Sequence, residues 1–225
     1  MQFLLMILSI SLNGQSNVLM AGQDRLFTDM GIIPIVGSAD PKVTGDIYLF
    51  EKSAKCDLFF RASRTMEDVW INYDIYNSQL ILLHNGKNFS IDFNLVEHFV
   101  VKESNQKFFN SSGLVGVEPN LALKVLFESP NLSFYQKTEL KILKSSYNEQ
   151  LDIGTKDTRI VSSFHYFLFE KEEESYMVFK PTKNSLKSLD NYKDLKGYIK
   201  ANNYDLGNEN DAVEVIKFYE RIKYK

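Results

Sequence analysis

The chain has 225 residues, with 26 Lys and Arg, 29 Asp and Glu, and a formal net charge of -3. Such a weak acidic excess exerts no long-range attraction on phosphate backbones, so the composition argues against nucleic acid as a partner. The one cysteine, Cys56, rules out an intramolecular disulfide and is predicted to be a buried apolar side chain.

The first segment, residues 1–14, is uncharged and largely apolar. It is too short to cross a bilayer, which needs about 20 apolar residues. Because small and polar residues follow it, the pattern predicts a signal peptide cleaved between Gly14 and Gln15, with a buried N-terminal strand as the alternative. We expect a periplasmic or extracellular protein, and no later apolar stretch is long enough for a transmembrane helix in the mature chain.

Residues 15–45 carry frequent turn-forming residues and no sustained period, which predicts an irregular N-terminal arm. An antiparallel β-rich domain is predicted over residues 46–182. A polar loop, 103–120, divides its strands into two sets. The predicted strands are 46–51, 57–62, 69–76, 79–84, 87–93, 97–102, 121–128, 132–143, 163–169 and 176–180.

Alternation of apolar and polar side chains gives each predicted strand one core face and one solvent face. In 69–76 the odd positions are apolar, and in 87–93 Phe89, Ile91 and Phe93 share one face. The dipeptide Asn85-Gly86 is typical of a type I′ hairpin turn. The pattern predicts an α+β fold with an antiparallel meander that forms a curved sheet or half-barrel.

In the last segment, residues 183–225, the spacing of apolar residues changes from every second residue to the 3.6-residue repeat of a helix. Asn191 and Asn208 are predicted to cap two helices, each with one apolar face. Gly197, in the middle of the first helix, costs about 1 kcal/mol relative to alanine. We expect the two helices to pack on the sheet as an antiparallel pair.

A possible binding face lies on the predicted strand 69–76. Trp70, Asn72, Asp74 and Tyr76 fall on its polar side, an arrangement that would suit a carbohydrate or peptide. The alternative is that the rings form a second packing layer under the C-terminal helices. The expected partner is therefore an unknown protein, peptide or carbohydrate.

Catalytic and metal-binding signatures are not recognisable in the sequence. His84, His98 and His165 lack the spacing of metal ligands, and Ser163 and His165 share a strand face without a third partner. No metal, cofactor or catalytic residue is therefore predicted. The acidic run 170–174 is predicted to be a solvated hairpin tip.

Three features of the sequence carry a resemblance: the short uncharged signal that ends in Gly14-Gln15, the strand 70–74 that leads to the turn at Asn77, and the C-terminal tail. The tail carries Leu186, Leu189, Tyr192, Leu195, Tyr198, Ile199, Asn202 and Asn203, followed by Phe218 and Tyr219. In these features the chain resembles a group of uncharacterised exported proteins of Bacteroidetes-type bacteria. The resemblance covers most of the mature chain and implies bacterial export, but it supplies no functional residues.

Two hypotheses about function follow. The favoured one is an exported, non-enzymatic envelope protein with a binding or structural role. The alternative is a hydrolase of envelope or environmental polymers, whose acidic site cannot be located from the sequence. A hydrolase would be marked by a concave pocket in which two or more carboxylates converge.

Overall fold

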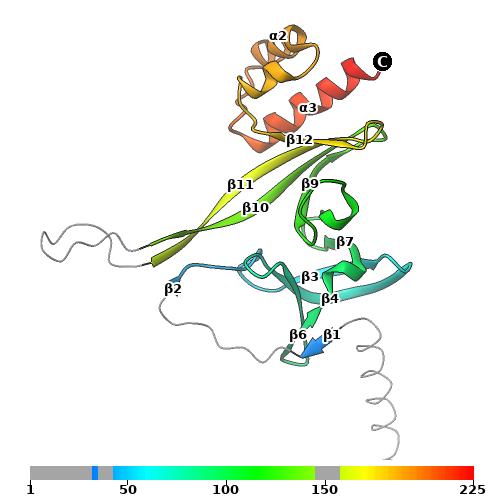
Figure 1. Cartoon of the computed structure of the whole chain (residues 1–225), viewed down its shortest axis with the longest axis vertical. Coiled ribbons are helices and arrows are strands. Elements are labelled where there is room, and N and C mark those ends of the chain that lie inside the picture. The colour runs from blue at the N-terminus through cyan, green and yellow to red at the C-terminus, as the bar shows by residue number, and fades with distance from the viewer. Residues whose placement is uncertain (1–31, 35–42, 145–157) are drawn as a thin grey trace, which may run out of the picture.

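The computed structural model describes residues 32–34, 43–144 and 158–225, so the predicted signal peptide lies outside the described residues (Figure 1). Twelve strands belong to one sheet. They are β1 (Ile32–Pro34), β2 (Val43–Thr44), β3 (Ala54–Phe60), β4 (Arg64–Asp74), β5 (Gln79–His84), β6 (Lys87–Ile91), β7 (Val96–Val101), β8 (Gln106–Asn110), β9 (Ala122–Glu128), β10 (Leu132–Leu143), β11 (Thr158–Glu170) and β12 (Ser175–Phe179).

The strand order is β1-β6-β5-β4-β3-β7-β8-β9-β10-β11-β12, and β2 pairs with β11 beside this path. All neighbours on the path are antiparallel, whereas β2 lies parallel to β11. Within the described chain the end strands β1 and β12 do not pair with each other, so the sheet is open. The predicted fold class, an antiparallel meander with a helical C-terminal part, is confirmed.

Several strands differ from the prediction. β8 lies inside the predicted loop 103–120, and it lacks alternation because Phe108 packs in one core and Phe109 against another. The predicted strand 46–51 contains only an isolated bridge between Tyr48 and Asp74. The predicted irregular arm contains β1 and β2, which at three and two residues are too short to show a period.

The described residues form three apolar clusters, the smallest of which contains Leu114, Leu121, Leu123 and Tyr135. One cluster joins β3 to β8 and includes Cys56, Ile71 and Phe99, all fully buried. A second cluster lies between β9–β12 and the helices α2 (Tyr192–Asn202) and α3 (Glu209–Lys223), which Figure 1 shows at the end of the molecule opposite β3–β6. Burial raises the pKa of the Cys56 thiol to about 12, so this residue is a packing group.

The hairpin turn and one helix cap follow the sequence prediction. Asn85 and Gly86 both have positive φ, at 50° and 73°, as a type I′ turn requires. The Asn208 side chain accepts hydrogen bonds from the backbone N–H groups of Asn210 and Asp211 at 2.9 and 3.3 Å, which confirms it as the cap of α3.

Asn191 is the N-cap residue of α2, as predicted, but it does not cap the helix with its side chain. Asn191 has a left-handed backbone, with φ at 58°, and its side chain makes no capping hydrogen bond. Its carbonyl oxygen instead accepts hydrogen bonds from the backbone N–H groups of Asp194 and Leu195, at 3.0 and 3.1 Å. The sequence pattern located the start of α2 but not the mechanism that begins it.

Gly197→Ala is expected to stabilise the protein by about 1 kcal/mol, because glycine lowers helix stability and nothing lies within 4 Å of the added Cβ position. The measurement is the free energy of unfolding from urea denaturation. A lower free energy of unfolding for the variant would contradict the packing of α2 described here.

Residues 43–50, here called the strap, connect the two halves of the sheet. At one end β2 pairs with the first two residues of β11. At the other end the Leu49 N–H donates to the Tyr73 carbonyl, and the Ile75 N–H donates to the Ile47 carbonyl, both at 2.9 Å. The strap therefore fixes the distance between the end of β4 and the start of β11.

Gly45 is the tightest point of the strap. Its φ of 127° lies in a region that L side chains rarely adopt, and a Cβ there would lie 2.7 Å from the carbonyl oxygen of Ile160. Only glycine lets the strap approach the backbone of β11 this closely.

The base of the acidic hairpin tip is an anchor for α3. The Lys223 ammonium lies 2.6 Å from Glu170 Oε2 and 3.7 Å from Asp190 Oδ2, and the Tyr219 hydroxyl donates to Glu170 Oε1 at 3.3 Å. The prediction of a fully solvated tip is therefore wrong for Glu170, although residues 172–174 are exposed.

Candidate functional site

The four residues of the predicted binding face do not share one environment. Trp70 and Tyr76 are exposed, at 51% and 63%, whereas Asn72 and Asp74 are buried, at 7% and 5%. The expectation that all four lie on a solvent face is therefore wrong for the two polar residues. The strap covers this part of β4, which alternation within the strand alone does not reveal.

The Asn72 side-chain amide hydrogen-bonds to the backbone of the strap, as the backbone of a neighbouring strand would. Its Nδ2 donates to the Phe50 carbonyl at 2.8 Å, and its Oδ1 accepts from the Phe50 N–H at 3.1 Å. Asp74 accepts hydrogen bonds from the backbone N–H and the side-chain amide of Asn77, at 2.9 and 2.8 Å. These polar groups stabilise the strap and the β4–β5 turn, so they are not free for a ligand.

The two exposed rings lie in different places. Trp70 pairs across the strands with Leu83, which is 36% exposed. Tyr76 lines a cavity of about 230 Å³ between the β4–β5 turn, the start of β9 and β10, and Trp70 is not part of that cavity. The structure therefore does not assemble the predicted platform of Trp70, Asn72, Asp74 and Tyr76.

Two cavities bring carboxylates together, as the acidic pocket of a hydrolase would: one beside the β11–β12 hairpin is lined by Glu170, Glu173 and Asp190, and the other is the cavity beside Tyr76. Glu118 and Glu139 both line it, together with Lys137. The Lys137 ammonium lies 3.4 Å from Glu118 Oε2 and 3.9 Å from Glu139 Oε1. His165 Nε2 also lies 2.7 Å from Glu139 Oε2. Both carboxylates thus face basic groups and tie neighbouring segments together.

The three histidines lie on different strands and do not converge. His98 stacks on the Phe59 ring, with 4.3 Å between ring centroids, and burial followed by the charge of Lys107 lowers its pKa. In the part of the chain that the structure describes, no group of three or more His, Cys, Asp or Glu side chains is placed to hold a metal ion.

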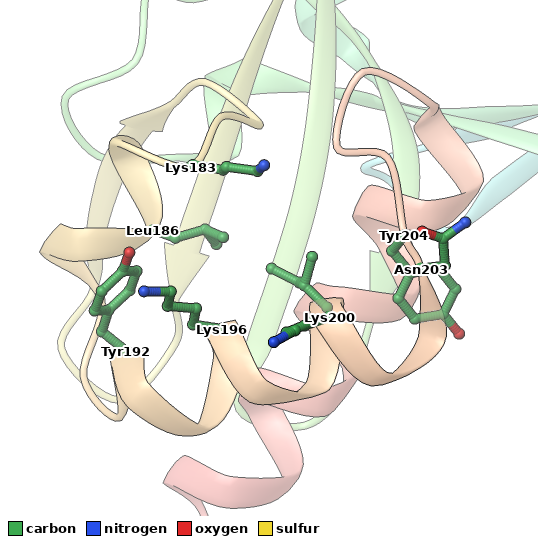
Figure 2. A pocket seen from close by; sticks show the side chains of 8 residues that line it. Lys183, Leu186, Tyr192, Lys196, Lys200, Asn203 and Tyr204 are labelled. Atoms are coloured by element: carbon green, nitrogen blue, oxygen red, sulfur yellow. The ribbon is translucent and has the colours of Figure 1, made fainter.

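A different cavity, here called the lysine pocket, lies between α2, the 3-10 turn η3 (Ser185–Ser188) and the segment after α2 (Figure 2). Its volume is about 320 Å³. It is lined by Lys183, Leu186, Tyr192, Lys196, Ile199, Lys200, Asn203 and Tyr204. In Figure 2, Tyr192 lies at one end of the cavity, Asn203 and Tyr204 lie at the other, and Lys183 extends above Leu186.

The helical repeat of α2 explains why the pocket is lined by both apolar and basic side chains. Leu195 and Ile199 are buried against the β9–β12 core, which fixes the rotation of the helix. Lys196 and Lys200 are four residues apart and therefore share the neighbouring face. The pocket consequently has an apolar floor, Leu186 and Ile199, beneath a basic rim.

The end of α2 places the far wall of the pocket. Asn203 adopts a left-handed conformation, with φ at 54°, and its backbone N–H donates to the carbonyls of Ile199 and Lys200. This C-cap ends the helix and turns the chain. Tyr204 then follows, and its N–H donates to the Ile199 carbonyl at 3.1 Å.

The rim of the lysine pocket is positive and unneutralised. Among the described residues, none of Lys183, Lys196 and Lys200 forms an ion pair, whereas the half-buried Lys124 and Lys223 do. Three ammonium groups over an apolar floor favour a ligand in which a carboxylate or phosphate is next to an apolar part.

The net charge of the whole chain hides the basic segment that forms this pocket, so the pocket was not predicted from the sequence. Residues 180–200 contain six lysines and two aspartates, a local net charge of +4 in a chain of formal net charge -3. Counting the charged residues segment by segment reveals this excess. The cavity itself depends on how η3 packs beside α2.

The fold and the pocket together define an open antiparallel β-protein whose helical end carries a basic, partly apolar cavity. No protein-family model, curated protein or solved structure matches the chain. The pocket is therefore identified as a candidate binding site from its geometry alone. Among the described helices, none has the length and apolar character needed to cross a bilayer.

Proposed function

We propose that this protein is an exported, non-enzymatic binding protein of the bacterial cell envelope. Its lysine pocket binds a small molecule, or a group of a larger one, that carries a negative charge beside an apolar part. The observation that carries this proposal is the combination of three unpaired lysines with the floor formed by Leu186 and Ile199.

The size and lining of the pocket support a compact ligand. Its volume of about 320 Å³ lies near the lower end of the range of about 300–1,000 Å³ that is usual for small-molecule sites. The lysines supply charge-assisted hydrogen bonds, while Tyr192 and Tyr204 supply flat apolar surface and hydroxyl groups.

Binding rather than catalysis is favoured by the chemistry of the lining. Lysine, tyrosine, asparagine, leucine and isoleucine line the pocket, without a carboxylate or histidine beside a nucleophile. Export is supported by the largely apolar residues 3–12 and the small, polar residues that follow them, which fit the apolar region and the cleavage site of a signal peptide.

Isothermal titration calorimetry with phenyl phosphate tests this function. Phenyl phosphate is expected to bind at least about tenfold more tightly than inorganic phosphate, because its ring also covers the apolar floor. Phenol, which lacks the charge, is expected to bind more weakly than phenyl phosphate. Equal affinity for all three compounds would contradict a pocket of mixed character.

The double variant Lys196→Met/Lys200→Met is expected to weaken phenyl phosphate binding by at least about tenfold, since each lost charge-assisted hydrogen bond contributes about 1.5–3 kcal/mol. Lys187→Met/Lys193→Met is the matched control, because it removes the same charge from the same segment outside the pocket lining. Equal losses in both variants would show that net charge, and not the pocket, determines binding.

A further inference from the structure

Positive charge on the helical end extends beyond the lysine pocket. All six lysines of residues 180–200 lack an ion-pair partner among the described residues, although eight lysines elsewhere have one. A pocket for a free small ligand needs only the three lysines that line it. We call the larger set, defined as the six exposed lysines of this one segment, the basic face: Lys180, Lys183, Lys187, Lys193, Lys196 and Lys200.

The spacing within α2 gathers half of the basic face into one stripe. Lys193, Lys196 and Lys200 are separated by three and four residues, so they lie along one side of the helix. The apolar residues Leu195 and Ile199 occupy the neighbouring side and are buried. The stripe is therefore directed away from the core cluster that holds the helix to the sheet.

Apolar and aromatic groups accompany these charges. The half-buried rings of Tyr192 and Tyr204 stand at the two ends of the lysine pocket (Figure 2). The buried side chains of Leu186 and Ile199 form its floor. Lysine and tyrosine together are typical of surfaces that meet the headgroup layer of a bilayer, where the charges contact phosphate and the rings reach the interface.

We propose that the basic face docks on the surface of an anionic lipid bilayer. The negative headgroups complement a local charge of +4, and a lipid phosphate next to its acyl ester is one form of the anion with an apolar part that the pocket favours. This inference extends the proposed function. Because Lys180, Lys187 and Lys193 lie outside the pocket lining, substituting them tests membrane docking separately from ligand binding in the pocket.

Vesicle co-sedimentation of the protein tests the docking. Phosphatidylcholine vesicles with about 30% phosphatidylglycerol are expected to bind the protein, and pure phosphatidylcholine vesicles are expected to bind it at least about tenfold less. Sodium chloride at about 0.5 M is expected to release it, because the charges are then screened within a few ångströms. No sedimentation with the anionic vesicles, or equal sedimentation with both kinds, would overturn the proposal.

Two charge-reversal variants distinguish the basic face from net charge. Lys180→Glu/Lys187→Glu/Lys193→Glu leaves the pocket lysines in place and is expected to reduce anionic vesicle binding at least about tenfold. Lys52→Glu/Lys87→Glu/Lys141→Glu changes the net charge equally at exposed positions on other segments and is expected to retain binding. Equal reductions in the two variants would overturn the assignment to this face.

The phenyl phosphate titration separates this inference from the proposed function. The first reversal variant is expected to retain a measurable heat of phenyl phosphate binding, which also confirms that its pocket is folded. Retained phenyl phosphate binding in the unsubstituted protein without vesicle binding would overturn the docking and leave the pocket function standing. The reverse result would overturn the pocket function alone.

Discussion

Replacing Gly45 by alanine is expected to lower the free energy of unfolding by about 3 kcal/mol. The new Cβ would lie 2.7 Å from the Ile160 carbonyl oxygen, and the φ of 127° is strained for any L side chain. The strap would have to move away from β11, and the hydrogen bonds of β2 would be lost with it. Urea denaturation gives the free energy directly.

Gly86→Ala is the matched control for Gly45→Ala. Gly86 also has positive φ, at 73°, but nothing lies within 4 Å of its added Cβ position. Gly86→Ala is expected to lower the free energy of unfolding by about 1 kcal/mol, because only the positive φ disfavours the new side chain. Equal effects at the two positions would show that the strap does not pack closely on β11.

Lys223→Met is expected to lower the free energy of unfolding by about 3 kcal/mol, because it leaves the half-buried Glu170 carboxylate without its ion-pair partner. Burial disfavours the Lys223 ammonium, but hydrogen bonds to Glu170 and Tyr219 outweigh burial and raise its pKa. Lys223 is therefore charged at neutral pH. Thermal unfolding at constant pH measures the change.

The double variant Lys223→Met/Glu170→Gln tests the cause of that loss. Removing both charges avoids an unpaired buried carboxylate, so most of the stability is expected to return. A double variant that is less stable than Lys223→Met alone would contradict this account of how α3 is held to the hairpin.

The meander and the helical end were predictable because their signals are local. Alternation in β4–β6, the Asn85-Gly86 turn and the Asn208 cap each depend on residues close together in the chain. β8 could not be found in this way, since both of its faces are covered by segments that the local sequence does not reveal.

The candidate site was harder to predict because it depends on tertiary packing. Asn72 and Asp74 follow the pattern of a solvent face, yet the strap, more than 20 residues earlier in the chain, makes hydrogen bonds with Asn72. The lysine pocket arises where η3 and the turn after α2 flank that helix, and each lysine alone resembles an ordinary surface residue.

The most direct test is a crystal structure of the protein with bromophenyl phosphate, in which the anomalous signal of bromine locates the ligand. We expect its phosphate oxygens within hydrogen-bond distance of Lys183, Lys196 and Lys200, and its ring over Leu186 and Ile199. An empty lysine pocket, with the ligand bound instead at the cavity beside Tyr76 or nowhere, would contradict the account.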